Sequence, residues 1–383
     1  MNLLIVLLGN NSLANYALIK HFTTNNDSFL PVSDKVMIVF SKQTEIKAEI
    51  IKKFFKNINF IEVNIDKNNK DNSRDVSIIE SIIMKELNKL NDVNSIHLNF
   101  TGGTSSMSVG AFEAVRNFKG CDDKDKFYSD IDNKHVLHFA RGEIYPLNGS
   151  ISDKLEFSIE DFAILENFTI LNLRRNNSQF FSLDFYKFLL NEVLKKETDF
   201  FESWDDCKDE KDVKNCEKYF KLWEEQLENF INFDSLDEND IFELIRFVRG
   251  VFLEEYVFYI LKKYKEEFNL KDIAWNVEIK NFKNKKFEVD VVVTKGADVY
   301  VFSCTTDKYE YLKQKSFEAI ARANHIGGYG AKPILVSCAN KKKVKGNLKE
   351  MIDRENKNSF DMIGREELLD ENKLLEKLKA IFR

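Results

Sequence analysis

Apolar residues in the first part of the chain fall into short continuous runs separated by stretches with helical spacing. Continuous runs predict strands covered on both faces, whereas apolar residues three or four apart predict helices. The predicted strands are 3–8, 36–40, 60–65 and 95–100. The predicted helices are 13–21, 44–55, 77–90 and a segment that ends near residue 117. This alternation predicts a doubly wound parallel sheet, closed by a hairpin of His135–Ala140 and Glu143–Pro146.

The pattern changes after about residue 150. Residues 149–240 are Phe-rich and acidic with helical spacing, and they predict a helical connector, for which a winged-helix-like module is one form. The dense charge run Asp199–Lys214 is interpreted as a solvated helix or loop.

A second α/β pattern begins at residue 241. A long amphipathic helix, 247–264, leads into three strands, one helix, one further strand and a C-terminal helix. These elements are predicted at 274–282, 287–294, 299–304, 311–323, 333–338 and 366–382. The chain therefore predicts an α/β protein of three parts, 1–148, 149–240 and 241–383.

Composition narrows the classes of protein. A net charge of −6 argues against a protein that coats duplex nucleic acid without sequence preference. A nuclease is still compatible with this charge, because its basic patches can be local. The five cysteines are scattered without a CxxC spacing, which favours a reducing cytoplasm and no structural zinc. The apolar N-terminal run stops at Gly9 and is too short to span a bilayer, so we expect a cytoplasmic protein with no membrane partner.

Small and hydroxylated residues gather where two predicted strands end. The fourth strand ends in Thr101-Gly102-Gly103-Thr104-Ser105, and Asn10-Asn11-Ser12 follows the first. In an open α/β sheet both loops lie at the carboxyl edge, where ligands bind. Glycines and a helix N-terminus would let a phosphate approach free N–H groups. Since no GxGxxG or Walker sequence is present, NAD binding and NTP hydrolysis are disfavoured. The alternative interpretation of Thr101–Thr104 is a tight turn with an N-cap.

Acidic residues gather in the second α/β pattern. Glu254 lies on the leading helix, with Glu255 beside it as an alternative. Glu288 and Asp290 share one face of a predicted strand, and Ser303-Cys304-Thr305 ends the next. Carboxylates in this arrangement are typical of sites that hold Mg²⁺ or Mn²⁺. The alternative for Glu288 and Asp290 is a solvated strand face.

These two features together resemble the CARF-domain nucleases of type III CRISPR systems. The NFTGGT element resembles a CARF domain of Rossmann-like fold, and the acidic pattern resembles the PD-(D/E)xK layout of restriction-endonuclease-like domains. The resemblance implies a homodimer that binds a cyclic oligoadenylate, most often the tetramer, and cleaves nucleic acid with a bound metal ion. It implies ligand contacts from Asn10, Asn11, Ser12, Thr101, Gly102, Gly103, Thr104 and Ser105. It implies metal ligation by Asp290, Glu254 and the backbone carbonyl of Cys304.

The sequence departs from that layout on one strand. Ser303 stands where some members have an acid, and Thr305 stands where the lysine is expected. Lys308 and Lys315 are candidate replacements, and Lys315, Glu318 and Arg322 have the spacing of one helical face. The candidate catalytic residues are Glu254, Asp290, Ser303, Thr305, Lys308 and Lys315.

Other residues with reactive or basic side chains have simpler interpretations. Cys304 and Cys338 are interpreted as buried small residues, and 325–328 as a loop. The basic stretch Lys341–Lys349 is interpreted as a solvated loop, with phosphate contact as the alternative.

Three functions follow as hypotheses. The first is a metal-dependent nuclease, activated by a cyclic oligoadenylate, that cuts single-stranded DNA or RNA or nicks duplex DNA. The second is a ligand-gated regulator that binds nucleic acid through a decayed nuclease domain. The third, a small-molecule enzyme using the N-terminal domain, lacks a dinucleotide fingerprint and a nucleophile–base pair.

Overall fold

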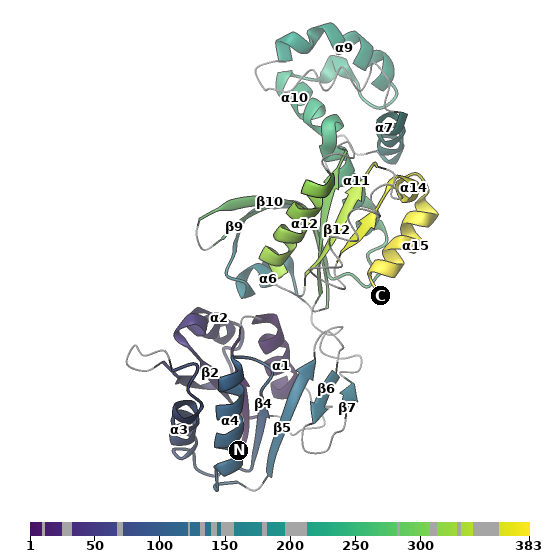
Figure 1. The fold of residues 1–383 in the computed structure, drawn as a ribbon. Helices are drawn as coiled ribbons and strands as arrows, with labels where there is room; N and C mark the ends of the chain where they lie inside the picture. The colour runs from purple at the N-terminus through teal and green to yellow at the C-terminus, as the bar shows by residue number, and fades with distance from the viewer. Residues whose placement is uncertain are drawn as a thin grey trace. The chain divides into compact units, whose positions relative to one another are not determined.

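The chain folds into two compact units, each with its own sheet (Figure 1). The first is formed by Met1–Phe168 and the second by most of the remaining chain. The computed structural model describes residues 1–9, 12–24, 33–66, 72–121, 123–130, 135–138, 144–146, 157–177, 182–195, 213–281, 284–296, 298–306, 312–327, 331–339 and 360–383.

The first unit is a doubly wound sheet whose strands, among the described residues, have the order β3-β2-β1-β4-β5-β6-β7. Strands β1 to β5 are parallel, and β6 and β7 are antiparallel additions. The strands are β1 Asn2–Leu7, β2 Lys35–Phe40, β3 Asn59–Asn64, β4 Ser95–Asn99, β5 Asp123–Asp130, β6 His135–His138 and β7 Ile144–Pro146. The helices are α1 Ser12–Thr24, α2 Glu45–Phe54, α3 Val76–Leu87, α4 Ser105–Asn117 and α6 Ile159–Leu165, with a 3₁₀ turn at Lys42–Thr44.

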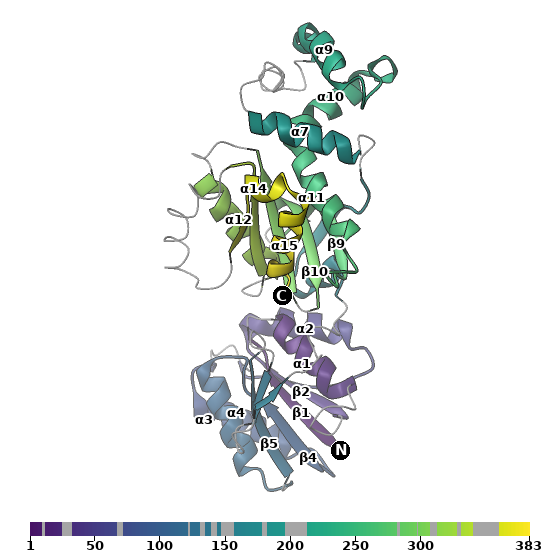
Figure 2. The ribbon, with the colours of Figure 1, turned by 90° about the vertical axis from the view of Figure 1, so that its right-hand side faces the viewer.

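Continuous apolar runs form the central strands because helices cover both faces of this sheet. Leu3, Ile5 and Leu7 pack into one core with residues of α3 and α4. Leu4 and Val6 are equally buried but face the opposite side, where α1 and α2 lie (Figure 2). The direction of strand addition reverses between β1 and β4, so the loops after these two strands flank the crevice where such sheets bind ligands.

The second unit is a mixed sheet with the order β13-β12-β11-β10-β9-β8 among the described residues. Strands β8, β9 and β10 pair antiparallel, and β11, β12 and β13 pair parallel. The strands are β8 Thr169–Arg174, β9 Asp272–Lys280, β10 Lys286–Lys295, β11 Asp298–Thr305, β12 Ala331–Ser337 and β13 Asp361–Ile363. The helices are α7 Leu183–Lys195, α9 Val213–Leu227, α10 Glu238–Arg246, α11 Phe252–Lys263, α12 Leu312–Gly327, α14 Arg365–Leu368 and α15 Glu371–Ile381. A 3₁₀ turn spans Phe233–Ser235, and a π-helical turn, Phe247–Val251, joins α10 to α11.

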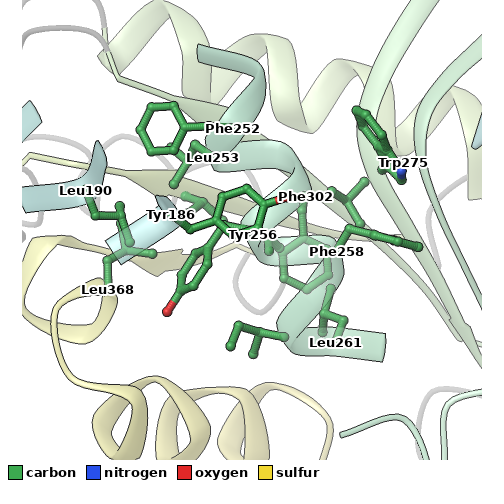
Figure 3. Packing of buried hydrophobic residues seen from close by; sticks show 14 of the residues in the cluster. Tyr186, Leu190, Phe252, Leu253, Tyr256, Phe258, Leu261, Trp275, Phe302 and Leu368 are labelled. Atoms are coloured by element: carbon green, nitrogen blue, oxygen red, sulfur yellow. The ribbon is translucent and has the colours of Figure 1, made fainter. Parts of the chain in front are cut away.

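Helix α11 lies at the centre of the core of this unit. Its Phe252, Tyr256 and Phe258 pack among strand residues and against Tyr186 of α7 (Figure 3). A helix that is apolar on several sides must be covered on several sides, as α11 is. The packing fixes the first turn of α11, which carries Glu254.

Helix α12 belongs to a separate apolar cluster. Ile334 and Val336 of β12 join the core around α11, whereas Leu335 packs with Leu312 of α12. Because side chains alternate along a strand, α11 and α12 lie on opposite faces of the sheet.

The predicted fold class is confirmed: a parallel α/β unit, a helical region and a second α/β unit. Three strands were not predicted, β5, β8 and β13. Residues 325–327 belong to α12, so their interpretation as a loop was wrong. The division at 148 and 240 and the winged-helix form of the connector stay predictions. The helices of the described residues include none with the length and apolar character needed to cross a membrane.

Candidate ligand and nuclease sites

The loops after β1 and β4 meet backbone to backbone in the first unit. A Cβ atom on Gly102 would lie 1.9 Å from the carbonyl oxygen of Leu7, and one on Gly9 would lie 2.9 Å from the nitrogen of Gly103. No side chain fits such distances, so Gly102 is required by this close approach. Gly103 has φ +77°, a left-handed conformation that favours glycine for a second reason. The structure therefore brings the two predicted loops together at one sheet edge.

The hydroxyl of Thr104 is used by the fold. Its Oγ1 accepts a hydrogen bond from the backbone nitrogen of Met107 at 3.2 Å and donates to the carbonyl of Ser73 at 2.8 Å. The backbone nitrogen of Thr101 donates to Oδ1 of the buried Asn99 at 2.9 Å. The N-cap interpretation therefore holds for Thr104. Gly103, Thr104 and Ser105 are nevertheless exposed and accessible to a ligand.

Ser12, at the start of α1, is fully buried, and its hydroxyl has no hydrogen-bond partner among the described residues. Asn10 and Asn11 lie outside those residues. Asn15, one helical turn after Ser12, was not predicted; its Oδ1 would be 3.3 Å from a Cβ on Gly102. Its spacing of three from Ser12 was the sequence signal that it faces the same edge.

Asp290 is the centre of the candidate nuclease site in the second unit. Its Oδ2 accepts hydrogen bonds from the backbone nitrogen of Cys304 at 2.6 Å and from Ser303 Oγ at 3.4 Å. Its Oδ1 lies 3.5 Å from a guanidinium nitrogen of Arg322 on α12. The side chain is only 12% exposed, so these neighbours fix its orientation.

The carboxyl groups of this site oppose one another's ionisation. Burial, together with the charges of Asp290 and Glu288, raises the pKa of Glu254 to about 9. Burial also raises the pKa of Asp290, while the N–H of Cys304 and the charge of Arg322 act in the opposite direction. Burial and the two acids keep the pKa of the Cys304 thiol raised, so the thiol stays protonated. Glu254 is thus electrostatically coupled to Asp290.

Glu255 faces the core instead. Its side chain is completely buried. The pKa of Tyr186 is raised first by the burial of Tyr186 and then by the charge of Glu255. The structure therefore favours Glu254 over Glu255 as the partner of Asp290.

Within the described part of the chain, the basic side chains that act on Asp290 come from α12. Thr305 on β11 is buried and neutral. Lys315 lies 3.6 Å from Glu318, and its charge acts against the raised pKa of Asp290. About one-third of each side chain is exposed for Lys315, Glu318 and Arg322. This similar exposure agrees with their predicted position on one face of the helix. Lys308 and the stretch 341–349 lie outside the described residues, and Cys338 is buried.

The acidic residues fit a divalent cation. Among the described residues, no three His, Cys, Asp or Glu side chains are already arranged to hold a metal ion. Mg²⁺, however, commonly takes one or two protein carboxylates and fills its other positions with water and phosphate oxygens. A cation would also relieve the opposition from neighbouring carboxylates, Asp290 and Glu288 for Glu254 and Glu288 for Asp290, that adds to burial in raising both pKa values.

The sequence matches two family models, the Card1 CARF domain over residues 3–156 and the Card1-like endonuclease domain over residues 242–382. The protein is therefore a CARF nuclease, and the predicted resemblance is confirmed. More particularly, it belongs to the Card1 type, with a Card1 CARF domain followed by a Card1-like endonuclease domain. No curated protein matches the sequence.

Solved structures share the fold at low sequence identity. Can2 from Sulfobacillus thermosulfidooxidans, in complex with cyclic tetra-adenylate, is 15% identical with a TM-score of 0.68, over 99% of both chains. Protein VC1899 from Vibrio cholerae is 14% identical with a TM-score of 0.68, over 100% of this chain and 98% of its own. A type III CRISPR defence DNA nuclease activated by cyclic oligoadenylate is 15% identical with a TM-score of 0.51, over 88% of this chain and 45% of its own.

Proposed function

We propose that the protein is an endonuclease of type III CRISPR defence, activated by a cyclic oligoadenylate and dependent on Mg²⁺ or Mn²⁺. The observation that carries the proposal is the pair of acidic residues, the buried Asp290 and the partly buried Glu254, whose charges interact inside the domain matched as an endonuclease. The charge of Asp290 opposes the ionisation of Glu254, and a divalent cation bound to both carboxylates would relieve that opposition.

The proposed activator binds at the edge formed by the loops after β1 and β4. The backbone of Gly103 is exposed at this edge, and the N-termini of α1 and α4 favour the negative charge of a phosphate. The buried hydroxyl of Ser12 supplies a further donor. Can2, of the same fold, was solved with cyclic tetra-adenylate, which supports the tetramer as the activator of this chain. A ligand of that size would lie across a homodimer.

The residues of the nuclease domain hold and orient the reacting groups. The N–H of Cys304 and the hydroxyl of Ser303 fix the Asp290 carboxylate, and Glu254 completes the acidic pair. The proposed ligands are Asp290, Glu254 and the backbone carbonyl of Cys304. When bound, the metal ion supplies an activated water and stabilises charge on the phosphate. Thr305 has no titratable side chain, so it cannot take the proton that a lysine at this position would take.

Nucleic acid, single-stranded DNA or RNA or nicked duplex DNA, is the proposed substrate. Purified protein is incubated with Mn²⁺, saturating cyclic tetra-adenylate and end-labelled strands of each kind. Wild type is expected to cleave at least one of them, and Asp290→Ala to reduce the rate by about 1000-fold, since the best-oriented acid is lost. Absence of cleavage, or equal rates in the two proteins, contradicts the proposal. Glu278→Gln, on the neighbouring strand β9, is the matched control and is expected to cleave like wild type.

A second function is favoured by the buried Thr305: a ligand-gated regulator that binds nucleic acid without cutting it. Ligand-dependent binding of DNA or RNA without hydrolysis supports this function. Thr305→Lys discriminates between the two. A large gain of cleavage indicates a decayed site, and an unchanged rate in an active enzyme indicates that another residue replaces the lysine.

A further inference from the structure

We propose that Arg322 of α12 replaces the positive charge that β11 lacks: it neutralises Asp290 in the metal-free site and binds the scissile phosphate in the loaded site. This inference rests on the proposed nuclease function. A lysine at position 305 would supply a positive charge from β11. Arg322 supplies that charge from α12 instead.

The position of Arg322 carries the argument. Its guanidinium lies 3.5 Å from Oδ1 of Asp290, while Oδ2 is held from the other side by the N–H of Cys304. One oxygen of the carboxylate thus accepts a hydrogen bond from the backbone, and the other contacts a positive charge that a metal ion can displace. Oδ1 is the oxygen left for a metal ion, and Arg322 occupies its approach.

The contact is loose enough to be exchanged. Charge-assisted hydrogen bonds between an arginine and a carboxylate are usually about 2.7–2.9 Å long, and this pair is wider. Among the described residues, Asp290 is the sole ion-pair partner of Arg322, and the side chain of Arg322 remains 30% exposed. When a divalent cation displaces it from Oδ1, the guanidinium stays beside the site with its N–H donors available to a phosphate.

The other basic candidate on α12 fits this role less well. Lys315 already pairs with Glu318, at 3.6 Å. The charge of Arg322 acts against the raised pKa values of both Asp290 and Glu254, whereas the charge of Lys315 acts against that of Asp290. An arginine is not a base at any physiological pH, so Arg322 positions and neutralises but does not deprotonate water.

The first test is calorimetric titration of Mn²⁺ into the full-length protein without nucleic acid. Arg322→Gln removes a cation that competes for Asp290, so Mn²⁺ is expected to bind about tenfold more tightly than in wild type. Arg322→Lys keeps the charge and is expected to bind within about threefold of wild type. Lys313→Gln removes an equal charge from an exposed position of the same helix and serves as the matched control, with wild-type affinity.

The second test measures cleavage at saturating Mn²⁺. Arg322→Gln is expected to cut about 100-fold more slowly despite tighter metal binding, because a donor to the phosphate is lost. Arg322→Lys should recover part of the rate. Opposite changes of metal affinity and rate are not produced by a merely structural residue, whose loss would weaken both.

Weaker or unchanged Mn²⁺ binding in a folded Arg322→Gln protein overturns the inference, as does a wild-type cleavage rate at saturating metal. Thermal melting establishes that the variants are folded, and Arg322→Lys provides the comparison if Arg322→Gln is not. If wild type cleaves no nucleic acid, the proposed function fails, and the calorimetric result alone decides the role of Arg322 as a counter-ion to Asp290.

Discussion

The two candidate sites are built from opposite kinds of chemistry. The edge in the first unit consists of glycine backbone, hydroxyls and the amide of Asn15, close to the starts of α1 and α4. The centre in the second unit consists of buried and partly buried carboxyl groups whose pKa values are raised by burial and by neighbouring carboxylates. The first site is shaped by steric fit, and the second by charge.

This difference predicts different responses to mutation and to pH. A site formed by close backbone approach tolerates no added atoms but changes little with pH. A site formed by opposed carboxyl groups tolerates isosteric amides but depends strongly on protonation.

Gly102→Ala is expected to lower the free energy of unfolding by about 3 kcal/mol, because its Cβ would overlap the carbonyl of Leu7. Gly9→Ala meets a longer contact, 2.9 Å, and should cost about 1 kcal/mol. Denaturant unfolding of both variants measures the ranking. Cyclic tetra-adenylate binding should be lost in Gly102→Ala, while Mn²⁺ binding is retained. Equal stabilities of Gly102→Ala and wild type would contradict the steric account of this edge.

The metal-free protein is expected to become less stable between about pH 5 and pH 9. The folded pKa of Glu254 is raised to about 9, whereas its ordinary value is 4.5. In this window the unfolded chain has released the proton that the folded protein still binds, so raising the pH favours unfolding. Relative to Glu254→Gln, wild type should lose about 2 kcal/mol across the window.

The measurement is denaturant unfolding in EDTA at pH 6 and pH 9. Glu376→Gln, at an exposed position of α15, should keep the pH dependence of wild type and serves as the control. A pH dependence in Glu254→Gln as steep as that of wild type would show that the raised pKa of Glu254 does not govern this site.

Ser12→Ala is expected to leave stability within about 0.5 kcal/mol, because the buried hydroxyl has no hydrogen bond to lose among the described residues. Its affinity for cyclic tetra-adenylate should fall about tenfold, the effect of one hydrogen bond to a charged group. Ser33→Ala is the matched control: this hydroxyl is also buried without such a partner, but it precedes β2 at the opposite sheet edge. Equal affinities of the two variants, measured by calorimetry, would remove Ser12 from the ligand edge.

The sequence predicted those parts of the fold where apolar residues run continuously. β1, β2 and β4 are covered on both faces and were predicted to within one or two residues. β5, with the sequence DKDKFYSD, contains too few apolar residues to show a strand pattern, and the apolar residues of the edge strand β8, TILNLR, do not alternate strictly with polar ones. Backbone pairing with β4 and β9 places them in the sheets, and pairing of that kind has no signature in a single sequence.

The candidate sites were predictable to a similar extent. The glycines after β4 and the alternation of Glu288 and Asp290 are local patterns, and they were visible. The choice between Glu254 and Glu255 was not, because it depends on which side of α11 faces the core. The contact of Arg322 with Asp290 joins residues 32 positions apart, and only the packing of α12 on the sheet brings them together.

The central claim is that a ligand held at the glycine edge controls the acidic site. The most direct measurement is the initial rate of cleavage by wild type in Mn²⁺ with and without saturating cyclic tetra-adenylate. A ligand that couples the two sites is expected to raise the rate by about 100-fold. Equal rates, with calorimetry showing the ligand bound, would contradict the claim.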